Sequence, residues 1–374
     1  MADVSPEIFH DLGADWRAVQ EATRAHVSTR RNTAASSAWT LWSAFCSTVG
    51  AHPDSLPQDP VPILQIFAQR LRAGSLSASG RRVKSRTVED TLRGVGQTYA
   101  ALVAVDPRMN HHGQIDFRLT SLYRSWANTD PPPSRVKPLP PSLLTQVVTL
   151  AHQEQTPAAS AAAEVLTLGF FFLLRPGEYL GQPNDLTDNL FRLRDVTFWV
   201  GSRAVDHLHG PVADLHAATF ATLTFTRQKN GVRNETIGHG HSGHPTICPV
   251  LCLVARVVSL RSWHAPPSAA LNAFRSAPGR PPTHVHARDL TRRMRSALTI
   301  FPDPSLNPND ISARSTCPGG AMALLCAGVG ADRIQMVGRW RSDELYRYLH
   351  VQAQQVMTGL SAAMLHGGHF QLAP

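Results

Sequence analysis

The chain has 374 residues, of which 43% are hydrophobic and 17% are charged, a composition that excludes disordered and collagen-like proteins and is typical of globular ones. This length is sufficient for two domains. With 36 basic and 27 acidic residues the formal net charge is +9, which favours a polyanionic partner such as nucleic acid or an anionic membrane surface.

The sequence indicates no membrane span, signal peptide or disulfide framework. The longest apolar run, residues 165–174, has about half of the ~20 residues that a membrane span needs, so we expect no transmembrane segment. The first ten residues lack a basic region followed by an apolar one, so we expect no signal peptide. The five cysteines are an odd number in a long chain and indicate no disulfide framework. We therefore expect an intracellular, reducing location.

The first domain is expected to be a small helical bundle. Apolar residues recur at helical spacing in three segments, residues 33–49, 61–71 and 86–103. Residues 131–141 then read PPPSRVKPLPP, which cannot propagate a helix and prefers stiff, extended backbone. We therefore place a helical domain at residues 1–130, a Pro-rich linker at 131–141 and a second domain at 142–374.

The second domain mixes two periodicities. Ser142 is a plausible N-cap for a helix with one apolar stripe, and residues 158–174 form a helix that is apolar all round. Residues 196–200 and 222–226 alternate like half-buried strands, and Asn230-Gly231 is a favoured hairpin turn leading to a strand at 232–237. Three more helices are expected after Pro249, at 283–298 and at 319–327. This domain should be mainly helical with a small antiparallel sheet.

Basic residues cluster at the start of one predicted helix. They are Arg81, Arg82, Lys84, Arg86 and Arg93. The N–H groups and the dipole of a helix N-terminus also favour anions, so this cluster is a candidate contact for DNA phosphates. The alternative is an ordinary solvated face.

Four dispersed segments carry the most specific signal. They are LLRPGE at 173–178, QKNG at 228–231, SARSTCPGGA at 312–321 and GRWRSD at 338–343, which is followed by Tyr346 and Tyr348. Together, and in this order, they resemble the tyrosine recombinases, the phage-integrase-type DNA strand transferases, and particularly their eukaryotic mobile-element relatives. The resemblance covers nearly all of the second domain, and the first domain looks like the core-binding domain of that family.

The resemblance implies a fold and a site. It implies a C-shaped clamp around double-stranded DNA, in which Tyr348 attacks a phosphodiester and forms a 3′-phosphotyrosyl link without metal or nucleotide cofactor. Arg175 would bind a non-bridging oxygen, Lys229 would protonate the leaving 5′ oxygen, and Trp340 would donate its indole N–H. Glu178 would orient Arg175. Tyr346 is expected to pack.

The third segment departs from the family pattern. Members read His-x-x-Arg before the Gly-Gly-Ala stretch, and the matching positions here are Arg314 and Cys317. Loss of the second arginine removes a cation from the transition state, which typically costs ~10²-fold or more in rate. Arg314 could replace that charge, but a guanidinium stays protonated and cannot act as a general base. The chain is therefore either an active recombinase or a decayed relative that only binds DNA.

Other interpretations stay open. A helical interaction protein without a nucleic-acid role would leave the four segments unexplained. His239, His241, His244, Cys248 and Cys252 could ligate zinc, although their spacing matches no paired Cys/His pattern. Family members act as tetramers on paired sites, and residues 352–365 are the candidate exchange helix. A nuclear location is expected if the source is eukaryotic.

Overall fold

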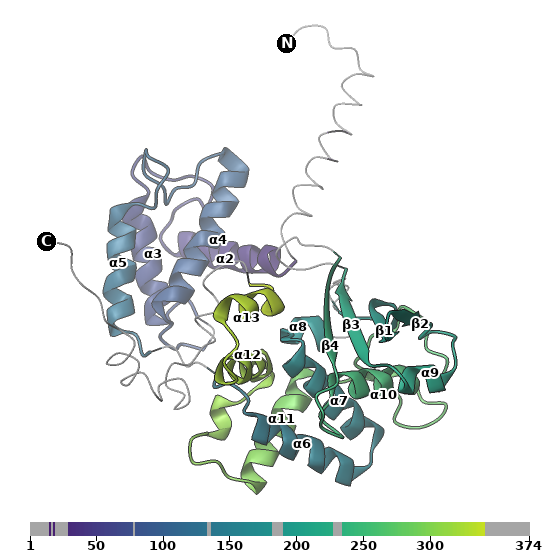
Figure 1. Ribbon diagram of the computed structural model, residues 1–374. Coiled ribbons are helices and arrows are strands. Elements are labelled where there is room, and N and C mark those ends of the chain that lie inside the picture. The colour runs from purple at the N-terminus through teal and green to yellow at the C-terminus, as the bar shows by residue number, and fades with distance from the viewer. Residues whose placement is uncertain are drawn as a thin grey trace, which may run out of the picture. The chain divides into compact units, whose positions relative to one another are not determined.

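The structure is a computed structural model that describes residues 15, 18, 29–77, 79–132, 136–181, 190–226 and 234–340 (Figure 1). The chain divides into two compact units, residues 1–133 and 134–374. The boundary falls inside the Pro-rich segment. Each unit has its own hydrophobic core and is described separately.

The first unit is a bundle of helices, as the apolar periodicity predicts. Its elements are α2 (Thr29–Thr48), α3 (Val61–Ala73), α4 (Ser85–Val103) and α5 (Phe117–Thr129). Their inward faces form a core rich in aromatic rings, in which Trp42, Phe45 and Phe67 are fully buried and in mutual contact. The three helices that the sequence predicts here are confirmed, whereas α5 was not predicted.

A buried ion pair ties the connection between α3 and α4 to the end of α5. Arg72 lies 2.5 Å from Asp130 and donates to the carbonyl of Val83, while Asp130 accepts from the backbone N–H of Ser85. A buried guanidinium is tolerated only when it is paired in this way. The pair therefore fixes the backbone on both sides of Lys84, where the basic cluster begins.

The second unit is mainly helical and contains a small antiparallel sheet. Its helices are α6 (Pro141–Glu154), α7 (Pro157–Phe171), α8 (Pro176–Tyr179), α9 (Val212–His216), α10 (Pro249–Arg261), α11 (Ala287–Ile300), α12 (Thr316–Cys326) and α13 (Ala331–Gly338). Short 3-10 turns lie at Leu193–Asp195, Pro308–Asp310 and Ala313–Ser315. This composition confirms the predicted fold class.

The sheet has four strands in the order β2-β1-β3-β4, and all its neighbours are antiparallel. The strands are β1 (Val196–Val200), β2 (Arg203–Val205), β3 (Phe220–Phe225) and β4 (Glu235–Gly240), and a separate pair is formed by β5 (Ala273–Phe274) and β6 (Thr283–His284). Val196 and Phe198 of β1 are buried, as their alternation predicts. The predicted Asn230-Gly231 turn lies outside the described residues.

Helix α7 is the centre of this unit. Most of its surface is apolar, and it packs against α6, α10 and α12 (Figure 1), as expected for a helix at the centre of a core. The exposed Ser160 and the partly buried Glu164 are polar exceptions. The predicted stripe of α6 is also buried. The predicted N-cap is wrong, because α6 starts at Pro141 and its cap is the extended Pro140, so that Ser142 lies in the first turn. Proline at the first helical position accounts for this start.

Two further boundaries differ from the sequence predictions. Residues 283–284 form β6, and the helix begins only at Ala287, where Asp289 accepts the N–H of His286. Of the strand expected at 232–237, residues 232 and 233 lie outside the described residues, and Asn234 precedes β4, which begins at Glu235. All five cysteines are free, and four of them are buried. No helix in the described ranges has the length and apolar character of a membrane span.

Candidate functional site

Arg175 lies where the chain leaves the central helix. Helix α7 ends at Phe171, Leu173 takes a left-handed conformation (φ 49°), and Arg175 becomes the N-cap of the short helix α8. The carboxylate of Glu178 accepts the backbone N–H of Arg175 at 2.8 Å and its Nη1 at 3.4 Å. The Arg175 side chain keeps 33% exposure. A partly exposed guanidinium held by a neighbouring carboxylate has the properties of an anion-binding group.

Helix α12 brings Cys317 to the same place because two glycines allow close packing. A Cβ on Gly320 would lie 2.1 Å from the carbonyl oxygen of Phe170 in α7, and one on Gly319 would lie 2.4 Å from the carbonyl of Leu139. Glycine is therefore required for α12 to approach α7. Cys317, at the second position of α12, is buried together with Leu173, Ala321 and Ile334.

The Cys317 thiol is neutral at physiological pH. Burial and, to a smaller extent, Glu178 raise its pKa, Arg175 and Arg339 lower it, and the net result is a pKa of about 12. The thiol is therefore close enough to Glu178, Arg175 and Arg339 to be affected by their charges. A neutral thiol therefore occupies the position at which the resemblance calls for a cation.

Trp340 completes the buried cluster. Its indole is 5% exposed and packs with Leu173 and Cys317. A Cβ on Gly338 would lie 2.1 Å from this ring, so only glycine permits the ring to fold back on the end of α13. The structure thus brings Arg175, Glu178, Cys317 and Trp340 together from three distant segments.

Arg339 belongs to the same group, although the sequence analysis gave it no role. Its side chain is 1% exposed, and its Nη2 lies 3.1 Å from Oε2 of Glu178. It adopts a left-handed conformation (φ 56°) as the C-cap of α13, and this turns its side chain into the interior. One signal was present in the sequence. Arg339 stands beside Trp340, and the segment 312–321 has Cys317 where the family pattern has an arginine. The conformation that buries it is not visible in the sequence.

Three other predicted residues stand differently. Arg314 lies in the 3-10 turn before α12, three residues from Cys317, and its side chain is exposed. Lys229 and Tyr348 lie outside the described residues, as do Tyr346 and the predicted exchange helix at 352–365. The roles assigned to them therefore stay predictions.

The basic cluster of the first unit separates into two groups. Arg86 and Arg93 form ion pairs with Glu89 and Asp90 along α4. Arg81, Arg82 and Lys84 are exposed on the connection before α4, and among the described residues no ion pair involves them. Cations whose charge is not already compensated have more to gain from a phosphate.

Replacing Arg81, Arg82 and Lys84 together by Ala is expected to weaken DNA binding and its salt dependence. Each cation that contacts a phosphate contributes about 0.9 to the magnitude of the slope of log K against log salt concentration. The slope of the triple variant should therefore be smaller in magnitude by up to about 2.7. Gel shifts at several salt concentrations measure this slope. The control is Arg86→Gln/Arg93→Gln, which should change it less, and a larger change in the control would contradict the assignment.

The residues of the zinc hypothesis do not converge. His239 packs edge-on against Phe172, and Nδ1 of His244 accepts the N–H of Ile247 in its own loop. Among these five residues, the side chains of His241 and Cys248 are hydrogen-bonded, at 3.3 Å between Nδ1 and Sγ. In the described part of the chain, no group of three or more His, Cys, Asp or Glu side chains is arranged around a possible metal position.

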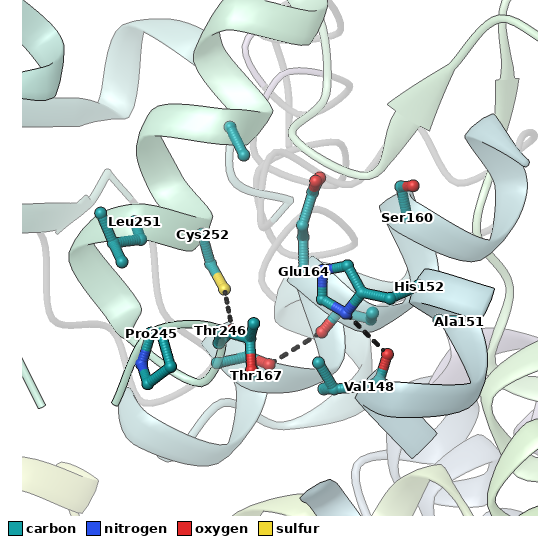
Figure 2. A pocket seen from close by; sticks show the side chains of 12 residues that line it. Val148, Ala151, His152, Ser160, Glu164, Thr167, Pro245, Thr246, Leu251 and Cys252 are labelled. Carbon is teal, nitrogen blue, oxygen red and sulfur yellow. Dashed lines mark hydrogen bonds between the residues drawn. The ribbon is translucent and has the colours of Figure 1, made fainter. Parts of the chain in front are cut away.

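A separate cavity of about 210 Å³ lies between α6, α7 and α10. Figure 2 shows its lining side chains, which include His152, Glu164, Thr167 and Cys252. His152 bonds to the carbonyl of Val148, and Cys252 donates weakly to that of Thr246 (Figure 2). Because these groups are engaged with nearby backbone, and no predicted site residue lines the cavity, we assign it no role in the candidate site.

The solved structures that match this chain include a recombinase and a transposon integrase. The XerA recombinase is 14% identical with a TM-score of 0.35, and the match covers 94% of this chain and 97% of that one. The Tn1549 transposon integrase bound to circular intermediate DNA is 13% identical with a TM-score of 0.47, covering 82% and 87%. Its complex with transposon right end DNA is 13% identical with a TM-score of 0.45, covering 84% and 88%.

These matches are at 13–14% identity and at TM-scores below 0.5, so the family resemblance read from the four segments stays a prediction. At these identities and TM-scores the likeness does not extend to activity or substrate. Comparisons of the sequence with protein-family models and with curated proteins gave no match.

Proposed function

We propose that this protein binds double-stranded DNA and breaks and rejoins it as a tyrosine recombinase, in DNA integration or recombination. The observation that supports this is the meeting of Arg175, Glu178 and Trp340 with Cys317 in one place. The segments that hold them are far apart in the chain and are three of the four that carry the family resemblance. A half-exposed arginine oriented by a carboxylate suits one non-bridging phosphate oxygen.

The reaction needs no cofactor. The Tyr348 hydroxyl would lose its proton to water and attack phosphorus, the bond to the 5′ oxygen would break, and the Lys229 ammonium would give that oxygen its proton. Arg175 would stabilise the charge that develops on the phosphorane. Rejoining is the reverse attack by a 5′ hydroxyl, which releases the tyrosine. A homo-tetramer on paired sites and a nuclear location remain predictions for this chain.

A second function is favoured by Cys317. Its neutral, buried thiol cannot stabilise a phosphorane, and exposed Arg314 cannot serve as a general base. Loss of the cation at Cys317 and of the base at Arg314 is expected in a decayed relative that binds DNA without strand transfer.

Covalent trapping separates the two functions. The protein is incubated with a nicked suicide DNA substrate, and adducts are resolved on a denaturing gel. We expect an adduct that Tyr348→Phe abolishes while its gel shift stays normal. No adduct from the wild-type protein, with a normal gel shift, would leave only the DNA-binding function. No salt-sensitive DNA binding at all would refute both.

A further inference from the structure

Arg339 is a buried cation in contact with the segment that holds Arg175 and Glu178 and with the end of β3. It donates to Glu178, which also holds Arg175. Its guanidinium lies 3.8 Å from the centroid of the Phe225 ring. Phe225 is the last residue of β3, shortly before the segment that contains Lys229. The electrostatic effect of Arg339 on Cys317 shows that the third segment is also near.

The charges of this group do not balance as they would in a simple structural ion pair. Glu178 offers one carboxylate to two guanidinium groups, those of Arg175 and Arg339. The other hydrogen-bond acceptors of Arg339 are the backbone carbonyls of Phe172, Leu173 and Val337, which are uncharged. A second carboxylate, that of Glu235, acts on Arg339 more weakly than Glu178 does. Burying an incompletely neutralised cation is costly. Of the two guanidinium groups that share Glu178, Arg175 is the more exposed, so it is the one that an approaching anion can reach.

The sharing of Glu178 between two guanidinium groups makes Arg175 more available to an anion. If Glu178 had Arg175 as its sole partner, the pair would be neutral and the carboxylate would compete with a phosphate for the guanidinium. Because Arg339 donates to Oε2 of Glu178 at 3.1 Å, the carboxylate charge is shared. Arg175, whose own contact to Oε1 is longer at 3.4 Å, is then available to an anion.

We propose that Arg339 is a positioning residue that supplies, through Glu178, the positive charge that is missing at Cys317. The inference rests on the proposed function. Arg339 does not touch the phosphate. It offsets the carboxylate that orients Arg175 and adds a fixed positive field in a poorly solvated region, where a charge acts over a longer range than in water.

The test measures the rate of covalent adduct formation on the suicide substrate. Arg339→Met should lower it roughly 10- to 100-fold. Arg333→Met is the matched control, since it makes the same change on an exposed residue of α13, and should stay within about twofold. Gel shifts and thermal melts of each variant establish that it folds and binds DNA. Equal rates for Arg339→Met and Arg333→Met would overturn the proposal.

Two double variants separate an electrostatic role from a packing role. Arg339→Met/Glu178→Gln restores the original charge excess while the Gln oxygen can still cap Arg175, so its rate should return to within about fivefold of wild type. Arg339→Met/Cys317→Arg moves the cation to the expected position and should be at least about tenfold faster than Arg339→Met alone.

A purely structural Arg339 predicts that neither double variant recovers, and that result would overturn the inference. If Arg339→Met does not fold, the charge-balanced double variant decides the question by itself, because a slow rate there refutes the electrostatic role. A wild-type protein that forms no adduct refutes strand transfer, and with it the role of Arg339. Adduct formation that is indifferent to Arg339 refutes the inference alone.

Discussion

Arg256→Met is expected to lower the free energy of unfolding of the second unit by about 3–5 kcal/mol, because it leaves the mostly buried carboxylate of Glu164, 19% exposed, without its partner. Arg256 lies in α10 with its side chain 1% exposed and pairs with Glu164 of α7 at 3.0 Å. It also donates to the carbonyls of Leu271 and Ala273, next to and within β5. One side chain therefore connects two helices and the small strand pair.

The matched control is Arg203→Met. Arg203 also has a carboxylate partner, Asp214 at 3.4 Å, but their side chains are 62% and 36% exposed. An exposed pair contributes at most about 1 kcal/mol. Urea unfolding monitored by circular dichroism measures both variants. Similar losses for Arg256→Met and Arg203→Met would show that burial of the pair is not what stabilises this unit.

The loss of unfolding free energy in Arg256→Met should also depend on pH. Burial raises the pKa of Glu164, and Arg256 counteracts this, so the variant should have a still higher Glu164 pKa. A carboxyl group whose folded pKa lies above its unfolded value favours the folded state at low pH and ceases to do so as pH rises through the folded pKa. The variant should therefore be less destabilised at about pH 5 than at about pH 7.5. Glu164→Gln in the same background should remove this dependence.

The parts of the fold that were predictable are those with a regular apolar period. Helix α7 and the inner face of α6 were recognised because apolar residues occupy their core positions, with Thr167 of α7 as the exception. The alternation in β1 and β3 was equally clear. The short elements α9, α13 and β5 were not predicted, because eight residues or fewer give too little periodicity to distinguish a helix or strand from a loop.

The candidate site was predictable only in part. Arg175, Glu178, Cys317 and Trp340 could be placed by motif, and the structure brings them together. Arg339 could not, since its burial depends on a left-handed residue at a helix end and on a carboxylate 161 positions away. The division of the basic cluster into paired and unpaired cations was also not predicted. The ion pairs of Arg86 and Arg93 with Glu89 and Asp90 depend on how the side chains lie along α4, which the sequence does not show.

Arg175→Ala is expected to slow covalent adduct formation by about 10²–10³-fold, the typical loss when one group that stabilises a developing oxyanion is removed. The fold should tolerate the change. The cap of α8 uses the backbone N–H of Arg175 and the carboxylate of Glu178, which Ala retains. Glu178 also keeps Arg339 as a buried partner. The melting temperature should therefore shift little while the rate falls.

Arg175→Lys distinguishes charge from geometry at this position. Lysine keeps the positive charge but loses the planar, two-pronged donor set of the guanidinium, so its rate should lie between those of Arg175→Ala and wild type. The rates are compared at saturating DNA. Under that condition the triple variant of Arg81, Arg82 and Lys84, which weakens binding, should react at the wild-type rate. If Arg175→Ala also matches wild type at saturation, Arg175 acts only in binding, and the assignment of a transition-state contact to it is wrong.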